Sequence, residues 1–138
     1  MNKTFAMIKP DAIESKNVGN IISMIELNGF NILRMQKTIL SIAQAEQFYG
    51  VHKERSFFRE LINYITSGPV VILALETIDA VNQWRNLIGA TNPSNALVGT
   101  VRKMYAESIG KNAVHGSDSS ENARIELKFF FKDLLIEE

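Results

Sequence analysis

The sequence contains no cysteine. A disulfide scaffold, a thiolate nucleophile and a cysteine-ligated metal site are therefore excluded. Histidine is scarce, with His52 and His115 alone, so a metal site built from several histidines is not expected. Acidic and basic residues number fifteen each, and this zero net charge argues against non-specific binding to nucleic acid or an anionic membrane. The 138 residues are 46% hydrophobic and 22% charged, which is the composition of an ordinary globular domain.

Long apolar runs are also missing. The first one ends at Lys9, which is too early for the hydrophobic region of a signal peptide. No segment approaches the ~20 apolar residues that a membrane span needs. The glycine-rich signatures of P-loop and Rossmann phosphate sites are absent as well. We therefore expect a cytoplasmic protein with a single domain over residues 1–138 and no membrane partner.

Four short segments are typical of β-strands: residues 4–8, 31–40, 70–75 and 112–115. The run at 70–75 is continuously apolar, which predicts a central strand. Within 31–40, Leu33, Met35 and Ile39 are predicted to share one face of the strand. Residues 90–111 show little periodicity, and irregular stretches of that length are often functional.

Helical periodicity occurs between the strands. It predicts a first helix from Val18 that stops at Asn28-Gly29, and a second that is capped by Ser41 together with Gln44. A short helix is predicted over 56–66, and another from a Thr77 cap to Ile88. A last helix runs through Leu134 and is predicted to be capped by Asp118 together with Glu121. Without the two small helices, the order is βαββαβ, which fits the ferredoxin-like arrangement. We expect an α+β fold: a four-stranded antiparallel sheet with helices packed around it, on one face.

His115 is the strongest candidate for chemistry. It ends a predicted strand, Gly116 follows it, and a helix is predicted to begin a few residues later. The N-terminus of a helix favours a bound phosphate and a neutral imidazole, which can act as nucleophile or base. Ser117 and Glu126 are nearby candidates for orienting the ring. The alternative is a histidine with a purely structural role.

Three cations are candidates for binding a phosphate. They are Lys9 after the first strand, Arg85 beside a core residue, and Arg102 in the irregular stretch. Each of them, taken singly, is more typical of a solvated surface charge. Phe57 lies off the apolar stripe of its helix, so it is either a platform on which a base stacks or peripheral core. His52 lies in a charged run that predicts a solvated loop.

Five segments occur in a familiar order: Ile8-Lys9-Pro10-Asp11, Ser67-Gly68-Pro69-Val70, Gly89-Ala90-Thr91-Asn92-Pro93, Gly99-Thr100-Val101-Arg102, and Asn112-Ala113-Val114-His115-Gly116-Ser117-Asp118-Ser119. Together they resemble nucleoside diphosphate kinase over essentially the whole chain. The resemblance implies a ping-pong transfer of the γ-phosphate from a nucleoside triphosphate to a nucleoside diphosphate through a phosphohistidine at His115. It also implies broad tolerance for the base, and Mg²⁺ held mainly by the nucleotide phosphates rather than by protein ligands.

The resemblance further implies a role for each site residue. Tyr49, Ser117 and Glu126 surround and orient the histidine. Lys9 and Asn112 hold the ribose, Phe57 stacks on the base, and Arg85, Thr91 and Arg102 hold the phosphates. No specific nucleic-acid partner is implied.

Assembly is a further expectation from the resemblance. It implies a homo-oligomer built from dimers. We expect a tetramer rather than a hexamer, because the chain ends at Ile136-Glu137-Glu138, soon after the last helix. Val18, Ile21 and Ile22 are candidates for the dimer interface, although they suit a core equally well.

Several positions depart from the pattern of the family: Ala12, the turn Ser15-Lys16-Asn17, Ser56, Val98, and Met104 within Lys103-Met104-Tyr105. None of them is assigned to chemistry, but the missing prolines at 56 and 98 leave the rigidity of two loops open. Two other function classes deserve comparison. A nucleic-acid-binding module on this topology would show aromatic residues in its strands and a basic surface. An inactive homologue would not need the complete set of site residues.

Overall fold

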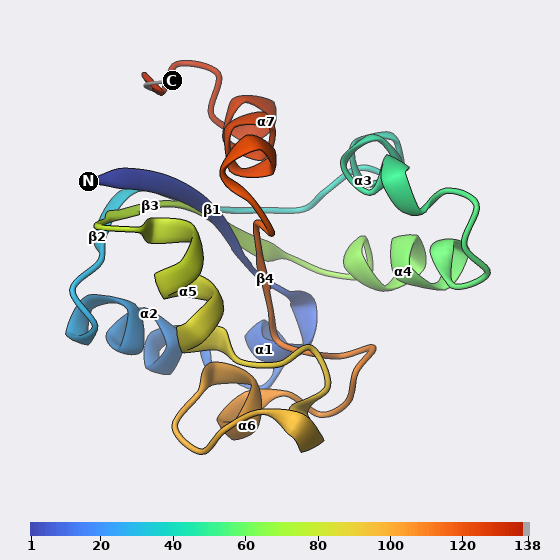
Figure 1. Cartoon of the computed structure of the whole chain (residues 1–138). Helices are drawn as coiled ribbons and strands as arrows, with labels where there is room; N and C mark the ends of the chain where they lie inside the picture. The colour runs from blue at the N-terminus through green and yellow to red at the C-terminus, as the bar shows by residue number, and fades with distance from the viewer. Residues whose placement is uncertain (137–138) are drawn as a thin grey trace.

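The computed structural model describes residues 1–136 and contains a four-stranded antiparallel sheet in the order β2-β3-β1-β4 (Figure 1). The strands are β1 (Asn2–Ile8), β2 (Asn31–Thr38), β3 (Val70–Thr77) and β4 (Val114–Gly116). β1 pairs with β3 along its whole length and with β4 over its last three residues. The predicted ferredoxin-like α+β fold is confirmed, and β4 is a short strand at one edge of the sheet.

Seven α-helices and two short 3₁₀ helices are found among the described residues. They are α1 (Pro10–Glu14), α2 (Val18–Leu27), α3 (Ile42–Phe48), η1 (Gly50–His52), α4 (Phe58–Ile65), α5 (Ala80–Ile88), η2 (Pro93–Asn95), α6 (Val101–Tyr105) and α7 (Ser120–Phe130). None of the helices described is long and apolar enough to cross a membrane.

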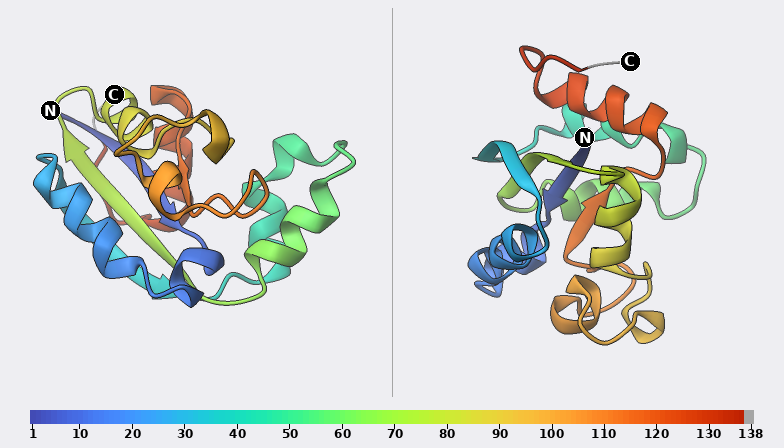
Figure 2. Two further views of the ribbon diagram at one scale, coloured as in Figure 1. Left: turned by 90° about the horizontal axis from the view of Figure 1, so that it is seen from below. Right: turned by 60° about the vertical axis from the view of Figure 1, so that its left-hand side comes forward.

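Helices cover both faces of the sheet, so the expectation of one covered face was wrong (Figure 2). Phe5 and Met7 of β1 pack with α3, α4 and α7, whereas Ala6 and Ile8 pack with α2 and α5. The reason is the continuous apolar character of β1 and β3. Each large apolar side chain left uncovered would forgo about 1.5–3 kcal/mol of burial energy, so both faces need a layer of helices.

β2 does not present the single apolar face predicted for it. Met35 is 53% exposed and Ile39, which follows the strand, is 64% exposed, while Leu33 is only partly buried. A register shift between Ile32 and Arg34 interrupts the alternation of the strand against β3. Because β2 lies at the edge of the sheet, these apolar side chains remain at the surface of the chain.

The predicted caps have mixed outcomes. The capping box at α3 is confirmed, since Ser41 Oγ accepts from the Gln44 main chain at 3.0 Å and the Gln44 side chain accepts in return at 2.9 Å. The Thr77 cap was wrong, because β3 continues to Thr77 as the partner of Asn2. Asp79, with φ +54°, precedes α5 instead.

The cap predicted for the last helix was also wrong. Asp118 and Glu121 do not form it; Ser119 Oγ accepts from the Asn122 main chain at 3.1 Å. The strand before it starts at Val114 rather than at residue 112.

The irregular stretch 90–111 contains η2 and α6. In Figure 1, α3 and α4 form a hairpin on one side of the molecule, and α6 lies below the sheet. An ion pair between Arg59 of α4 and Glu46 of α3, at 2.8 Å, joins the two helices of the hairpin. The hairpin, α7 and the 90–111 stretch frame the site described next.

Candidate active site

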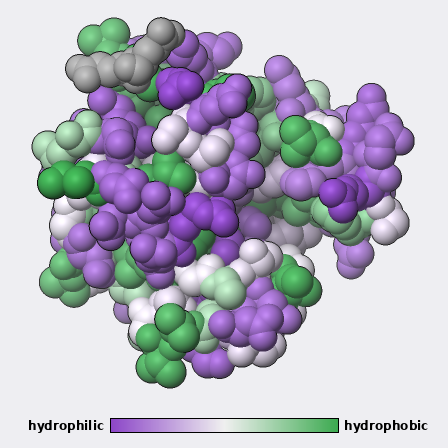
Figure 3. All heavy atoms as spheres, viewed as in Figure 1, coloured by the Kyte–Doolittle hydropathy of each residue, from purple (hydrophilic) through white to green (hydrophobic). Residues whose placement is uncertain are grey.

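A cavity of about 1320 Å³ is lined by the α3–α4 hairpin, α5, α7 and the stretch 90–111. The same face of the molecule is visibly hollowed beside the hairpin (Figure 3). Except for Ser117, which is fully buried, every site residue named from the sequence lies on the cavity wall. These residues are Lys9, Tyr49, Phe57, Arg85, Thr91, Arg102, Asn112, His115 and Glu126.

His115 of β4 is oriented by a carboxylate from α7. Its Nε2 lies 2.9 Å from Glu126 Oε1, and Ser117 donates its hydroxyl proton to the same oxygen at 2.7 Å. A carboxylate accepts only, so Nε2 carries the ring proton and Nδ1 carries the lone pair. Nδ1 has no hydrogen-bond partner within residues 1–136. The arrangement leaves one nitrogen free to act as a nucleophile.

Aromatic rings surround the imidazole. The ring of His115 lies 5.8 Å from Phe5, 5.3 Å from Phe48 and 6.2 Å from Tyr49, centroid to centroid. The Tyr49 hydroxyl is buried without a hydrogen-bond partner in the described part of the chain. Burial, followed by the charge of Glu126, raises the pKa of Tyr49 far above its usual range. The hydroxyl is therefore a proton donor at neutral pH that lacks an acceptor.

Lys9 and Asn112 meet in the wall of the cavity. The Lys9 ammonium donates to Asn112 Oδ1 at 2.8 Å, and both residues are buried. Burial, and then the charge of Arg102, lower the pKa of Lys9 from 10.5 to about 8. The solvated-charge alternative is thus wrong for Lys9.

Arg102 of α6 is buried and binds three main-chain carbonyls. Its Nε donates to Asn112 at 3.3 Å. Its terminal nitrogens donate to Gly89 at 3.0 Å and to Val114 at 2.9 Å. Burial, and then the charge of Arg85, lower the pKa of Arg102 to about 10, which leaves it protonated at neutral pH. The side chain therefore joins the end of α5 to β4 and still presents a cation to the cavity.

The exposed part of the wall carries the other predicted residues. Arg85 and Thr91 are solvent-exposed on the wall, and Phe57, at the N-terminus of α4, is 45% exposed. The charged run 51–55 is exposed apart from His52, so the expected solvated loop holds for the run but not for His52 itself. His52 is half-buried in η1, lines the cavity, and its ring lies 5.7 Å from that of Phe57.

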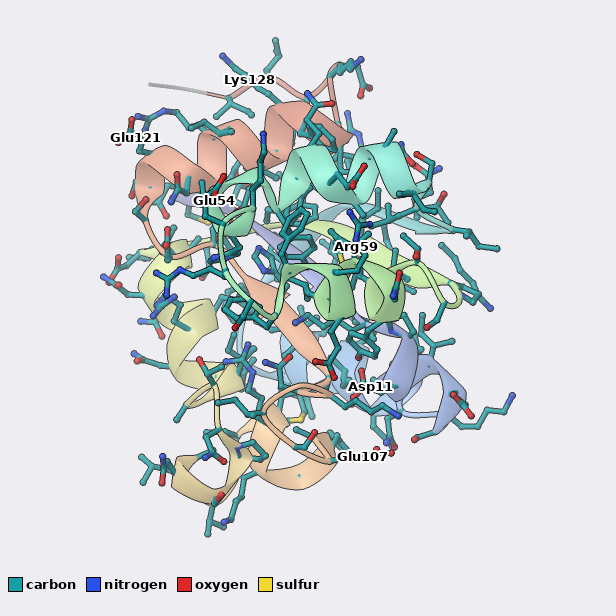
Figure 4. The ribbon with its side chains drawn as sticks, turned by 90° about the vertical axis from the view of Figure 1, so that its right-hand side faces the viewer. Asp11, Glu54, Arg59, Glu107, Glu121 and Lys128 are labelled. Atoms are coloured by element: carbon teal, nitrogen blue, oxygen red, sulfur yellow. The ribbon has the colours of Figure 1, made fainter. Side chains whose placement is uncertain are left out.

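Asp11 has a structural position that the sequence did not assign. It accepts the hydroxyl proton of Tyr64 and the main-chain N–H of Ala113, the latter at 3.1 Å. Figure 4 labels Asp11 at α1, next to α4. Ala113 has φ +72°, a conformation that non-glycine residues adopt at a cost of about 1–2 kcal/mol. The Asp11 carboxylate thus holds the turn that precedes β4.

Protein ligands for a metal are not gathered at the site. Within the described residues, no three His, Asp or Glu side chains lie close enough together to hold a metal ion. The donor set of the wall is instead rich in cations, which suits phosphate oxygens.

Comparisons with known proteins identify the family of this chain. The family model for nucleoside diphosphate kinase matches residues 2–136. Curated relatives named nucleoside diphosphate kinase include one from Geobacter sulfurreducens, 50% identical over 97% of this chain and 98% of the relative. Another, from Campylobacter jejuni, is 54% identical over 96% of each chain.

Solved structures point to the same family. A nucleoside diphosphate kinase from Aquifex aeolicus has a TM-score of 0.94 and 37% identity, with 99% of both chains covered. One from Encephalitozoon cuniculi has a TM-score of 0.94 and 38% identity, covering 99% of this chain and 95% of that one. The chain therefore belongs to the nucleoside diphosphate kinase family.

Proposed function

We propose that the cavity binds a nucleoside triphosphate and that His115 Nδ1 receives its γ-phosphate. The family transfers phosphate between nucleotides by a ping-pong mechanism through a phosphohistidine. One observation carries the assignment to this atom: Glu126 occupies Nε2, and Nδ1 is left with a lone pair and no partner among the described residues. His115 itself lies on the wall of the cavity.

The transfer forms one bond to phosphorus and breaks one. The Nδ1 lone pair forms a bond to the γ-phosphorus, and the bond between that phosphorus and the β–γ bridging oxygen breaks. The electron pair leaves with the nucleoside diphosphate. The proton stays on Nε2, where the Glu126 carboxylate stabilises the positive charge that the ring gains. A second nucleoside diphosphate reverses these steps and leaves with the phosphate.

The cations of the wall hold the charge that spreads over the phosphate in the transition state. In this proposal Arg85, Thr91 and Arg102 bind the phosphates. Arg102 has N–H groups beyond the three that bind carbonyls, so it can do both. Lys9 and Asn112 bind the ribose and the region of its 3′-hydroxyl. Their mutual hydrogen bond supports this, because it places both polar groups at one point of the wall.

Tyr49 is proposed to donate its hydroxyl proton to the phosphate on His115. A buried hydroxyl without a partner costs about 1–3 kcal/mol, and a phosphate oxygen would satisfy it. The ring is already placed edge-on to the imidazole at 87°. Ser117 acts indirectly: its hydroxyl donates to the Glu126 oxygen that orients the histidine.

Mg²⁺ is proposed to enter with the nucleotide. The wall offers cations to phosphate and no cluster of protein ligands within the described residues, which suits an ion held mainly by phosphate oxygens. The ion would neutralise charge on the phosphates during transfer.

A broad choice of bases is proposed for the same cavity. Phe57 presents a partly exposed ring, and stacking on a ring does not read the edge of a base. ATP, GTP and the other nucleoside triphosphates and diphosphates are then all substrates. The cytoplasmic location expected from the sequence stays a prediction.

We also propose a homo-oligomer built from dimers, with a tetramer favoured over a hexamer. Leu27 at the end of α2, Met35 on β2 and the adjacent Ile39 are exposed apolar residues on a sheet edge and the helix beside it, which suits a dimer interface. Ile21, one of the predicted interface candidates, is fully buried in the core and is not available. The preference for a tetramer over a hexamer stays a prediction, and residues 137–138, on which it was partly based, lie outside the described part of the chain.

Labelling with γ-³²P-ATP tests the proposal. The protein should acquire label that is lost in acid and stable in base. His115→Gln should abolish the label, while His52→Gln, the matched change at the other histidine, should retain it. Label that persists in folded His115→Gln would refute the assignment.

A further inference from the structure

The backbone of His115 has little support from the sheet. β4 is three residues long and is paired with β1 at the edge of the described sheet, with Met7 opposite His115. A strand this short offers few ladder hydrogen bonds to resist displacement. The position of the His115 main chain therefore depends on contacts from outside the sheet.

Trp84 of α5 makes such a contact. Its indole Nε1–H donates to the main-chain oxygen of His115 at 3.1 Å. The side chain is fully buried, and Phe30 packs edge-on against it with ring centroids 6.0 Å apart. The indole is thus buried, and its N–H binds the carbonyl of the histidine.

Gly116 permits this approach. A Cβ atom at Gly116 would lie 2.7 Å from Cδ1 and 2.8 Å from Nε1 of Trp84, closer than such atoms can come. Its φ is not positive, so the requirement for glycine at this position is space rather than backbone conformation. The indole therefore sits directly against the chain that follows His115.

The same helix serves the phosphate side of the cavity. Arg85 follows Trp84 in α5 and lies on the wall. Arg102 binds Gly89 at the end of α5 and Val114 beside His115. α5 and β4 are thus joined on both sides of the nucleophile, once through Trp84 and once through Arg102.

We propose that Trp84 is a positioning residue for phosphoryl transfer. Its indole N–H fixes the main chain at His115 and so sets the distance between Nδ1 and a phosphate bound at Arg85. This role rests on the proposed function, in which His115 is the phosphorylated residue. A displacement of about 1 Å at the reacting atoms can lower the rate about 10²-fold. Loss of the hydrogen bond from the Trp84 indole should therefore lower the rate of the chemical step.

Trp84→Phe tests the role, because it keeps an apolar ring and removes the N–H. We expect kcat and the single-turnover rate of phosphohistidine formation to fall about 10- to 100-fold, with KM for the nucleoside triphosphate changed less than about 3-fold. Phe30→Leu is the matched control. It loosens the packing of the same indole, lowers the thermal midpoint, and should leave the single-turnover rate within about 3-fold of wild type.

An unchanged single-turnover rate in folded Trp84→Phe would overturn the proposal. An equal loss of rate in Phe30→Leu would also overturn it, since packing alone would then explain the effect. If Trp84→Phe does not fold, Gly116→Ala decides, because the added Cβ displaces the indole; an unchanged kcat there contradicts the role. Wild-type labelling is measured first. Its absence refutes the proposed function itself, whereas normal labelling with a full rate in Trp84→Phe refutes only the role of Trp84.

Discussion

Lys9 combines a positive charge with nearly complete burial. Burial makes the charged form costly, so the pKa of Lys9 falls from 10.5 to about 8, close to physiological pH. The proposed contact with the ribose needs the protonated ammonium. Nucleotide capture should therefore weaken as pH rises through about 8.

The lowered pKa of Lys9 should give nucleotide binding and the stability of the fold opposite dependences on pH. The unfolded chain keeps the Lys9 proton up to about 10.5, so between about 8 and 10.5 it binds more protons than the native state. The free energy of unfolding should therefore rise with pH in that window while kcat/KM falls. Both slopes are measured on wild type and on Lys9→Gln, which keeps a donor for Asn112 but does not titrate. An identical alkaline decline of kcat/KM in Lys9→Gln would contradict the assignment.

Phe57 is proposed to stack on the base of every nucleotide, and its removal should affect them all alike. Phe57→Ala should raise KM for ATP, GTP, CTP and UTP by similar factors, because stacking contributes about 1–3 kcal/mol per base whatever its identity. The side chain is 45% exposed, so the thermal midpoint should change little. Steady-state kinetics with the four nucleotides provide the measurement. A loss confined to one base would reveal a polar contact to that base.

Residues within compact motifs were predictable from the sequence. His115, Lys9 and Arg102 stand in short, distinctive segments, and the structure places all three on one cavity. Trp84 and Asp11 were not given site roles, because each acts across a long separation. Trp84 binds a carbonyl 31 residues away, and Asp11 binds an N–H 102 residues away. Contacts of that kind leave no local pattern in a sequence.

At the scale of elements, Arg102 connects α6, the end of α5 and β4. Its three donors serve the carbonyls of Gly89, Asn112 and Val114. A lysine has a single ammonium and cannot reach three carbonyls in the fixed geometry of a guanidinium. Helix and strand are thus held together by one side chain that is also proposed to bind phosphate.

Arg102→Lys should therefore lower stability as well as activity. The Asn112 carbonyl keeps a second donor, the Val114 main-chain N–H at 2.8 Å, so the loss falls on the carbonyls of Gly89 and Val114. A buried carbonyl left without a donor costs about 1–3 kcal/mol, so we expect a loss of about 2–6 kcal/mol in the free energy of unfolding. Urea denaturation measures it. Arg85→Lys is the control, because Arg85 is exposed and donates to no carbonyl within residues 1–136; its midpoint should stay near that of wild type. Equal midpoints for both variants would contradict the structural part of the role of Arg102.

Element types were predictable, while their ends often were not. The apolar run before Thr77 predicted β3 correctly. Thr77 nevertheless failed as a helix cap, because pairing with Asn2 of β1 keeps it in the strand. Ser41 succeeded because its partner Gln44 lies in the same turn of helix. Hydrogen bonds between residues of one helical turn can be predicted from a sequence. Pairing between strands that are distant in the sequence cannot, and it decides the structure where the two compete.

At the scale of the whole molecule, the two-sided sheet decides where the site lies. Because β1 is apolar on both faces, helices pack on both, and β4 at the edge places His115 towards α3 and α7. The βαββαβ order predicted the sheet but not the second helical layer. The number of covered faces follows from the total apolar surface rather than from the order of elements.

The proposed assembly of four chains can be tested by the mass of the protein in solution. Light scattering at micromolar concentration should give four times the mass of one chain, 15.5 kDa. Met35→Asp places a charge on the exposed edge strand and should lower the mass while the isolated fold persists. A mass of one chain for wild type would contradict the oligomer, and a sixfold mass would contradict the tetramer.

The identity of the phosphorylated nitrogen tests whether Nδ1 of His115 is the nucleophile. Glu126 accepts the proton of His115 Nε2, and Nδ1 is left as the nucleophile. Nuclear magnetic resonance of ¹⁵N-histidine-labelled phosphoenzyme distinguishes the two isomers by the coupling of phosphorus to ring nitrogen. We expect phosphate on Nδ1 of His115 alone. Phosphate on Nε2, or on His52, would contradict it.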